Sequence, residues 1–292
     1  MNRAARVYLW TERIFYGKFL EDETLAITKE RLDVYLVNNN FFSSREKARA
    51  AVMAGLVFLD GQRVDKPGHP VKPGTKIEIQ GNPLPYVSRG GLKLEKALQA
   101  FQINLQDRVV LDIGASTGGF TDCALQNGAK RVYAVDVGYG QLAWKLRSDP
   151  RVVSLERTNI RYLEPEALEE RPDFVTVDVS FISLALVLPR VAMLTLPVTE
   201  GIALIKPQFE AGKERVGKKG VVREPEVHRD VIEKVIGVVD HLGWQVGGLD
   251  FSPVRGPEGN IEYLLYFLKG HSPQELITDC DEVVARAHRE LS

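Results

Sequence analysis

A glycine-rich turn between an apolar strand and a helix is the most distinctive chemical feature of the sequence. The run Val109–Phe120 reads as an apolar strand ending at Asp112, a loop containing Gly114, Gly118 and Gly119, and the start of a helix. Glycines allow a ligand to approach the backbone closely, and a helix N-terminus favours negative charge. The pattern is typical of a cofactor site.

Three kinds of cofactor site use such a turn, and two of them do not match. A Walker A loop has Lys and then Ser or Thr after its last glycine, whereas Phe120 follows Gly119 here. A dinucleotide fingerprint requires glycine at its third position, where this chain has Ser116. The remaining kind binds S-adenosylmethionine (SAM), which has no pyrophosphate. The turn residues that we expect to bind this cofactor are Asp112, Gly114, Ser116, Thr117, Gly118, Gly119 and Phe120.

Polar residues at the ends of the following strands extend this site. Asp136 ends the next strand, where a carboxylate can accept hydrogen bonds from both ribose hydroxyls. Asn159, after the third strand, is a candidate contact for adenine, and capping of its own loop explains it nearly as well. Asp178 and Lys206 end the fourth and fifth strands, beyond which open α/β sheets bind their ligands. A lysine beside such a crevice can act as a base where burial or another cation helps.

Alternating strands and helices must position these residues. After a linker at Pro83–Pro85, the alternation predicts a Rossmann-like α/β fold with a doubly wound, mostly parallel sheet. Strands are expected over Arg108–Ile113, Arg131–Val137, Val152–Leu155, Phe174–Val179, Ile202–Ile205 and Tyr263–Phe267. Helices are expected over Phe120–Asn127, Ser183–Leu196 and Pro225–Leu242. We expect His228 and His241, in the last helix, at the surface or at a helix end and not as metal ligands.

A small α+β module precedes the linker. Ser43 or Ser44 can cap a helix over Arg45–Val52, and Gly55 can end it. An Asp60-Gly61 turn then predicts a hairpin, and residues 71–81 alternate as one strand. The domains expected from these patterns are an extension over residues 1–28, the small module over 29–85, a catalytic domain over 86–270 and a charged helical tail over 271–292.

Charge is unevenly distributed along the chain, although the formal net charge is only -1. Residues 29–96 hold 12 Lys and Arg against 7 Asp and Glu, whereas residues 97–292 hold 22 against 28. A basic module on an acidic body is typical of a protein in which one domain binds a polyanion and the other does chemistry. With two cysteines and no apolar run of membrane-spanning length, we expect a cytoplasmic protein with no membrane partner.

Six motifs follow one another along the chain: Ser88–Leu94, Leu111–Asp122, Val175–Leu184, Leu204–Glu210, Gly217–Val222 and Gly259–Leu264. Together they resemble the TlyA family of ribosomal RNA 2′-O-methyltransferases, which are often called hemolysin A. The preceding module resembles the S-four-type RNA-binding domain through residues 31–33, 44–48 and 55–57. The resemblance covers about residues 29–268. It implies an FtsJ-like methyltransferase domain, SAM as cofactor, and ribosomal RNA or ribosomal subunits as partners.

The catalytic Lys-Asp-Lys-Glu tetrad of that family falls on Lys93, Asp178, Lys206 and Glu262. The resemblance implies that Lys206 deprotonates or polarises a ribose 2′-hydroxyl, while the other three residues orient it for attack on the SAM methyl group. The two lysines are expected to lower each other's proton affinity, and the carboxylates to hold the geometry. Because the sulfonium is already an activated methyl donor, no metal is expected.

Basic side chains supply the expected RNA contacts. The loop Lys213–Gly220 leaves the same sheet edge as Lys206, which favours phosphate binding over a merely solvated loop. Phosphate contacts predict a structured RNA without specifying the nucleotide, for which the family resemblance favours cytidine. The residues expected to bind RNA are Arg31, Ser44, Arg45, Lys47, Arg49, Arg89, Lys213, Arg215, Lys218 and Lys219.

Three other functions compete with that of a SAM-dependent rRNA (cytidine-2′-O)-methyltransferase. An RNA-binding ribosome-assembly factor with little or no catalysis would keep this fold, but it would not need two lysines and two acids at these positions. A membrane-lytic hemolysin is disfavoured because no strongly amphipathic basic helix stands out. A dehydrogenase is disfavoured by Ser116 in the glycine turn.

Overall fold

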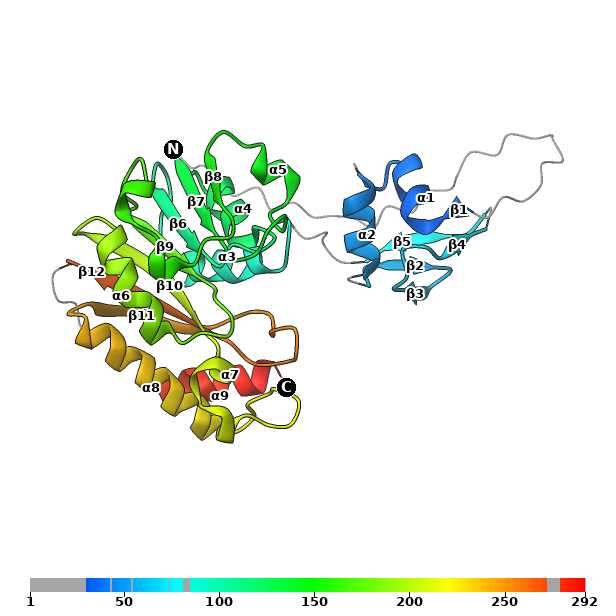
Figure 1. The fold of residues 1–292 in the computed structure, drawn as a ribbon. Helices are drawn as coiled ribbons and strands as arrows, with labels where there is room; N and C mark the ends of the chain where they lie inside the picture. The colour runs from blue at the N-terminus through cyan, green and yellow to red at the C-terminus, as the bar shows by residue number, and fades with distance from the viewer. Residues whose placement is uncertain are drawn as a thin grey trace, which may run out of the picture. The chain divides into compact units, whose positions relative to one another are not determined.

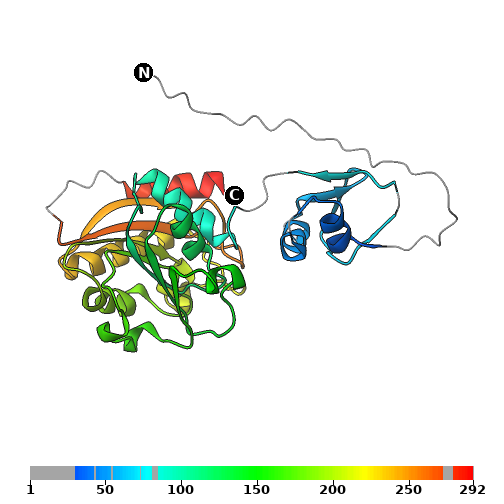
Figure 2. The ribbon, with the colours of Figure 1, turned by 90° about the horizontal axis from the view of Figure 1, so that it is seen from above.

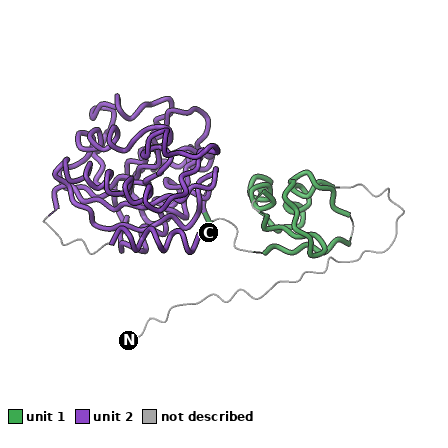
Figure 3. Tube along the Cα trace, turned by 90° about the horizontal axis from the view of Figure 1, so that it is seen from below, with its two compact units in different colours: residues 1–85 green, residues 86–292 purple. Residues whose placement is uncertain are grey.

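The chain divides into two compact units, residues 1–85 and 86–292 (Figure 3), and each is described by itself. Within them, the computed structural model describes residues 30–42, 44–53, 55–72, 74–80, 85–271 and 279–291. The expected extension over residues 1–28 lies outside the described residues, as do Ser43 and the first two residues of the expected linker, Pro83 and Leu84.

The first unit is an α+β module with its own apolar core. Helices α1 and α2 pack with a three-stranded antiparallel sheet of order β3-β2-β5, and the short strands β1 and β4 form an antiparallel pair. Leu32, Leu36, Val52 and Val57 are fully buried between these elements. The element bounds are β1 Glu30–Arg31, α1 Leu32–Asn38, α2 Arg45–Met53, β2 Val57–Leu59, β3 Gln62–Val64, β4 Pro70–Val71 and β5 Ile77–Ile79.

Local sequence signals explain most of the boundaries in this unit. The Ser44 hydroxyl accepts a hydrogen bond from the Lys47 backbone N–H at 3.3 Å, as a cap of α2 should. Gly55 follows α2 with a φ of 70°. The single strand expected over residues 71–81 is wrong, because Gly74 adopts a φ of 81° and the chain turns between β4 and β5.

The second unit is built on a seven-stranded sheet of order β11-β12-β10-β9-β6-β7-β8 (Figure 1). The strands from β10 to β8 in this order are parallel, whereas β12 is antiparallel to both β10 and β11. This topology confirms the predicted Rossmann-like, mostly parallel sheet. The strand bounds are β6 Val109–Ile113, β7 Arg131–Val135, β8 Val152–Leu155, β9 Phe174–Val177, β10 Thr199–Ile205, β11 Gln245–Phe251 and β12 Tyr263–Lys269.

Helices cover both faces of this sheet (Figure 2). Along β6, Leu111 belongs to the apolar core shared with α6, α8 and α9, whereas Val110 belongs to the core shared with α3 and α4. Both residues are fully buried, as expected for a strand covered on both faces. The helix bounds are α3 Gly90–Ala100, α4 Gly119–Gln126, α5 Trp144–Arg147, α6 Leu184–Leu194, α7 Pro207–Glu210, α8 Pro225–His241 and α9 Cys280–Glu290.

Two elements of the second unit differ from what the sequence suggested. Strand β11 was not predicted, and its register with β12 shifts between Val246 and Gly248, which is a bulge of the kind that glycine favours. The described part of the tail forms α9, whose Val283, Val284 and Ala287 are buried in the core. The apolar side of α9 is therefore part of the hydrophobic core of the second unit. No helix in the parts of the chain described above is long and apolar enough to cross a membrane.

Candidate active site

Four charged side chains meet in a line of alternating sign in the second unit. Lys93 Nζ lies 2.6 Å from Glu262 Oε2 and 3.6 Å from Asp178 Oδ2, and Lys206 Nζ lies 2.5 Å from Asp178 Oδ1. Lys93 comes from α3, Asp178 and Lys206 directly follow β9 and β10, and Glu262 directly precedes β12. The fold thus brings together the four residues that the family resemblance proposed as a tetrad.

Burial of the tetrad is compatible with its charges, since two cations face two anions. Lys93 and Lys206 are 8% and 9% exposed, and Glu262 is 1% exposed. Burying an ion is costly unless a partner of opposite charge and hydrogen bonds compensate it. Asp178 accepts contacts from both lysines, so it is the central member of the line.

The two lysines differ in their surroundings. Burial acts to lower the pKa of the Lys93 ammonium, but the charges of Asp178 and Glu262 outweigh it and hold that pKa above its ordinary value. Any lowering of the Lys93 pKa by the second lysine, as expected from the sequence, is therefore outweighed by the two carboxylates that contact Lys93. Lys206 has Asp178 as its carboxylate partner and also donates a hydrogen bond to the Ser180 hydroxyl at 3.1 Å.

The backbone around Asp178 explains why it can reach both lysines. The Asp178 N–H donates to the Ile113 carbonyl oxygen at 2.9 Å, which continues the pairing of β9 with β6 past the end of the strand. Gly114 has a φ of 85°, and a side chain at this position would collide with the Asp178 carbonyl group. Lys206 is followed by Pro207, the first residue of α7, which ends β10. The glycine and the proline thus place the two side chains at one edge of the sheet.

A pocket of about 680 Å³ lies at the same edge, and Asp178 lines it. Its volume is in the range of small-molecule sites. Ile113, Val135 and Ile160 provide apolar lining, whereas Asp136 and Asn159 provide oxygen acceptors. Because Asp178 belongs to both the pocket and the tetrad, a molecule held in the pocket would lie against the tetrad.

Five of the residues expected to bind the cofactor line this pocket, and they are Gly114, Ser116, Asp136, Asn159 and Asp178. The Asp136 carboxylate accepts hydrogen bonds from the backbone N–H groups of Ser116 and Gly138, both at 2.7 Å, which fixes its orientation. The side chain of Asn159 accepts from the Arg161 backbone N–H at 3.1 Å. Asn159 therefore caps its own turn and also lines the pocket.

The other expected cofactor residues, Asp112, Thr117, Gly118, Gly119 and Phe120, are not part of the pocket lining. Asp112 is fully buried, and its two oxygens accept hydrogen bonds from the hydroxyls of Thr121 at 2.6 Å and Thr176 at 2.8 Å. Burial raises the pKa of Asp112 to about 6. The side chain thus ties β6 to β9 and α4 beneath the glycine turn.

Gly118 and Gly119 permit close packing around the start of α4. A side chain on Gly119 would collide with the Ser88 hydroxyl and with the backbone at Gly91, at the start of α3. Gly119 therefore lets α4 approach the helix that carries Lys93. Gly118 has a φ of 96° and precedes α4, and a side chain there would collide with Leu142 and Leu146 instead.

Phe181 is a pocket residue that the sequence reading missed. Its side chain is 90% exposed, and its φ of 64° is unusual for a bulky residue. The centre of the Phe181 ring lies 4.9 Å from that of Phe209, and Phe209 follows Lys206 by three residues in the chain. Phe181 lies inside the motif Val175–Leu184, but nothing in the sequence marked this one residue of the motif as exposed. Exposure and backbone conformation together indicate a functional position.

The basic residues expected to bind RNA in the first unit are partly pre-oriented. Arg31 and Arg45 place their Nε atoms 3.1 and 2.9 Å from the carboxylate of Asp33, which is fully buried. Both arginine side chains remain more than half exposed, at 55% and 56%. Asp33 was not predicted as a site residue, yet it holds both guanidinium groups in place. Lys47 and Arg49 are exposed on α2.

Five expected RNA-binding residues belong to the second unit. Arg89 is exposed directly before α3. Lys213, Lys218 and Lys219 are exposed in the segment between α7 and α8. Arg215, in the same segment, forms an ion pair with Asp230 at 2.6 Å, so part of its charge is already compensated.

His228 lies in the first turn of α8, near a helix end as expected, but the alternative that it lies at the surface is wrong. His228 is fully buried in α8, where it shares the apolar face with Val231 and Val235 at helical spacing. Its Nδ1 lies 2.7 Å from the Tyr263 hydroxyl oxygen and its Nε2 lies 3.1 Å from the carbonyl oxygen of Val222. Burial lowers the pKa of His228 to about 4. The ring is a buried neutral hydrogen-bonding group.

Comparison with known proteins supports the resemblance read from the motifs. Residues 86–269 match the family of FtsJ-like methyltransferases, and residues 30–77 match the S4 domain. YqxC of Bacillus subtilis, a candidate rRNA methyltransferase, is 54% identical over 90% of this chain and 95% of its own length. The 16S/23S rRNA (cytidine-2′-O)-methyltransferase TlyA of Mycobacterium tuberculosis is 46% identical over 82% of this chain and 89% of its own.

A solved structure agrees with these relatives. The structure of a candidate hemolysin from Streptococcus thermophilus is 52% identical in sequence, covers 91% of this chain and 98% of its own, and superposes with a TM-score of 0.72. Sequence, fold and the geometry of the tetrad lead to the same assignment. The chain therefore belongs to the TlyA family, in which an S4 domain precedes an FtsJ-like methyltransferase domain.

Proposed function

We propose that this protein transfers the methyl group of SAM to the 2′-hydroxyl of a cytidine in ribosomal RNA. The observation that carries the proposal is the position of Asp178, which lines the 680 Å³ pocket and also contacts both lysines of the tetrad. The names of the relatives from Mycobacterium tuberculosis and Campylobacter jejuni support cytidine-2′-O methylation of rRNA.

The residues of the pocket suit SAM. Asp136 can accept hydrogen bonds from the two ribose hydroxyls of the cofactor, and Ile113, Val135 and Ile160 offer apolar surface to its adenine. The carboxylate of Asp178 offers a negative charge toward a cationic sulfur. When bound, SAM supplies a methyl group that is already activated by this positive sulfur. Asp112 and the glycines 118 and 119 support the site from outside the pocket.

Lys206 is the residue that we propose to act on the substrate hydroxyl. A ribose hydroxyl is a weak nucleophile until its proton is removed or its O–H bond is polarised. A neutral Lys206 would take that proton as the oxygen–carbon bond forms and the sulfur–carbon bond breaks. Asp178, 2.5 Å away, would then stabilise the ammonium that results. A charged Lys206 would instead polarise the hydroxyl by donating a hydrogen bond to its oxygen, and the Asp178 carboxylate would take the hydroxyl proton as the oxygen–carbon bond forms and the sulfur–carbon bond breaks.

Lys93 and Glu262 act as positioning residues in this proposal. Lys93 stays protonated because two carboxylates hold its pKa high, so it is a fixed cation next to Asp178. Glu262 compensates that cation at 2.6 Å. The pair therefore fixes the Asp178 carboxylate with one oxygen toward Lys206, and this preorganised geometry lowers the cost of reaching the transition state.

The first test is methyl transfer from labelled SAM to ribosomal subunits and to naked rRNA, with wild type beside Lys206→Ala and Lys206→Arg. We expect labelled ribose with wild type and a loss of at least 100-fold with Lys206→Ala. Lys206→Arg separates the two roles, because arginine can polarise a hydroxyl but cannot accept its proton. Lys130→Ala, an exposed position at the start of β7, is the matched control and should transfer methyl groups at the wild-type rate.

Two outcomes would count against the proposal. SAM binding without methylation of any RNA would favour an RNA-binding assembly factor. Methyl transfer to a base, or to ribose at an unchanged rate in Lys206→Ala, would contradict the reaction or the role of Lys206.

A further inference from the structure

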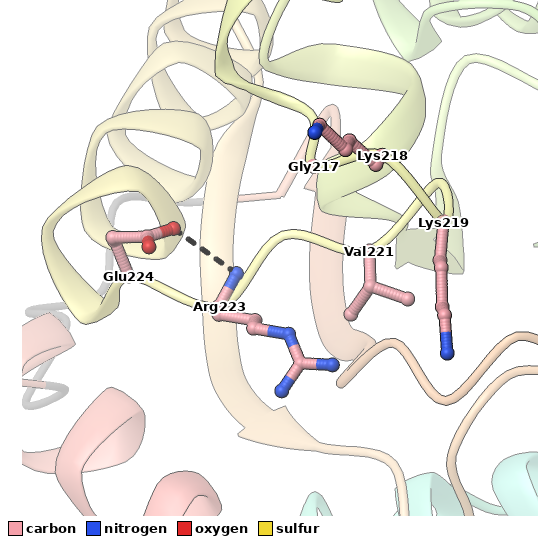
Figure 4. A pocket seen from close by; sticks show the side chains of 6 residues that line it. All are labelled: Gly217, Lys218, Lys219, Val221, Arg223 and Glu224. Atoms are coloured by element: carbon pink, nitrogen blue, oxygen red, sulfur yellow. Dashed lines mark hydrogen bonds between the residues drawn. The ribbon is translucent and has the colours of Figure 1, made fainter.

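The segment between α7 and α8 forms a second pocket, of about 240 Å³. Lys219 and Arg223 extend in the same direction with Val221 between them, and Glu224 lies farther along the chain, at the start of α8 (Figure 4). The lining carries three cations and one carboxylate. It consists of Gly217, Lys218, Lys219, Val221, Arg223 and Glu224.

The three cations of this pocket lack the ion pairs that neighbouring cations form. Within the described part of the chain, no carboxylate lies within 4.0 Å of the charged groups of Lys218, Lys219 or Arg223, whereas Arg215 pairs with Asp230. Three cations beside the single carboxylate of Glu224 leave the lining with a net positive charge, which raises the local positive potential. An anion entering the pocket would lower that repulsion without displacing an existing partner.

Buried side chains hold the pocket loop in place. The Asn260 amide, 1% exposed, donates to the Gly220 carbonyl oxygen at 2.8 Å and accepts from the Val222 backbone N–H at 2.9 Å. His228 contacts the Val222 carbonyl oxygen at 3.1 Å. The Gly217 N–H closes the turn on the Val221 carbonyl oxygen, also at 3.1 Å. The backbone of the pocket is thus ordered before any ligand binds, which reduces the entropic cost of binding.

The same anchors connect the pocket to the tetrad. Asn260 precedes Glu262 by two residues, and Glu262 contacts Lys93 at 2.6 Å. Tyr263, the next residue, gives its hydroxyl to the contact with His228 at 2.7 Å. One short segment therefore supports both the pocket loop and the end of the tetrad. A group bound in the pocket would be held at a set distance from the catalytic side chains.

We propose that this pocket binds one backbone phosphate of the substrate RNA and thereby places the target ribose at the tetrad. The inference rests on the proposed function and deepens it, and it adds Arg223 to the residues that contact substrate. A phosphodiester suits the pocket because it carries one negative charge and oxygens that can accept from Lys219 and from the guanidinium of Arg223 together. The exposed position of these side chains favours a phosphate of a long polyanion.

The test compares two double variants that remove the same charge from opposite edges of the sheet. Lys219→Ala/Arg223→Ala empties the pocket of two cations. Lys130→Ala/Arg131→Ala removes two cations at the start of β7, the exposed Lys130 and the partly buried Arg131, which pair with Glu170 and Glu169. The dissociation constant for ribosomal subunits is measured with each full-length protein between 50 and 200 mM salt. Equal melting temperatures would show that both variants fold.

We expect the pocket variant to bind about tenfold more weakly than wild type at 50 mM salt and about threefold more weakly at 200 mM, as the loss of one phosphate contact predicts. The slope of log Kd against log salt should fall by about one. The control variant should keep the wild-type slope. Lys219→Arg/Arg223→Lys, which conserves both charges, should restore the slope and the affinity.

Identical slopes in the pocket and control variants would overturn the inference. Binding of inorganic phosphate by wild type and its loss in the pocket variant, with RNA affinity unchanged, would assign the pocket to a free phosphate and would also overturn it. Failure of the proposed function has a different signature, since wild type would then bind subunits with the expected slope but transfer no methyl group. A lower slope in the pocket variant, together with normal methylation by wild type, would support both the phosphate site and the proposed methyl transfer.

Discussion

Lys93 and Glu262 are 169 residues apart in the sequence and only 2.6 Å apart in the structure. Both are almost fully buried, so each compensates the other's charge. The pair joins the helix that opens the second unit to the segment leading into β12, which lies between β10 and β11. The contact therefore serves the fold and the site together.

This pairing predicts a large stability loss when one partner is removed. Lys93→Met should lower the free energy of unfolding by about 3–5 kcal/mol, because it leaves the Glu262 charge buried without its partner. Adding Glu262→Gln should recover most of that loss. Urea unfolding measures both effects. Lys96→Met on the same helix, whose ion pair with Asp250 is less buried, is the control and should cost about 1 kcal/mol. Equal losses of unfolding free energy in Lys93→Met and Lys96→Met would show that burial of the Lys93–Glu262 pair makes no difference.

Phe181 should show a trade-off between stability and activity. Its φ of 64° is costly for phenylalanine, so Phe181→Gly should raise the free energy of unfolding by about 1 kcal/mol. The same change should lower kcat/KM for rRNA by about tenfold or more, since stacking of a base on an exposed ring contributes about 1–3 kcal/mol. Tyr162→Gly, an exposed aromatic outside the pocket lining, is the matched control for activity. Full activity in Phe181→Gly would rule out a substrate contact.

The buried Asp112 should make stability depend on pH in a defined direction. Its folded pKa of about 6 lies above the ordinary value of 3.8, so the unfolded chain releases this proton more readily. The contribution of Asp112 to the free energy of unfolding is thus fully present below pH 3.8 and is lost as pH rises through 6. Asp112→Asn should remove this loss. Compared with wild type, the variant should therefore be more stable at pH 8 than it is at pH 5, as thermal unfolding would show. If Asp112→Asn instead binds SAM tenfold more weakly while its stability is unchanged, Asp112 contacts the cofactor directly.

His228 should contribute a pH dependence at lower pH. An unfolded histidine takes up a proton below 6.5, whereas buried His228 does so only near pH 4. The unfolding free energy should therefore fall by up to about 3 kcal/mol as pH drops through this window. His228→Gln should flatten the profile, while His241→Gln, exposed at the end of α8, should leave it unchanged. Parallel profiles for wild type and His228→Gln would show that another group titrates.

The sequence predicted most strands of the second unit because parallel strands buried on both faces are continuous apolar runs. Val109–Ile113 is apolar except for Asp112, and all five of its residues are buried. Strand β11 escaped prediction because two adjacent glycines, Gly247 and Gly248, carry no strand signal, and its pairing with β12 determines its conformation. Residues 71–81 did contain a local turn signal, Pro73-Gly74, and the single-strand prediction gave it too little weight.

The site was predictable where its residues end strands. Asp178 and Lys206 could be placed from sequence because the carboxyl ends of parallel strands share one edge. Lys93 and Glu262 could not, since on their own they read as a helix surface and the start of a strand. Only the family resemblance proposed them, because their relationship depends on a contact between distant parts of the chain.

The place of β12 in the sheet has a consequence for biosynthesis. This strand enters between β10 and β11, and the residue before it, Glu262, completes the tetrad. During translation the glycine turn, Asp136, Asp178 and Lys206 all leave the ribosome earlier. A nascent or prematurely terminated chain can thus possess the parts of a cofactor pocket while Lys93 still lacks its buried counter-charge. The tetrad becomes complete only when the late strand has paired on both sides.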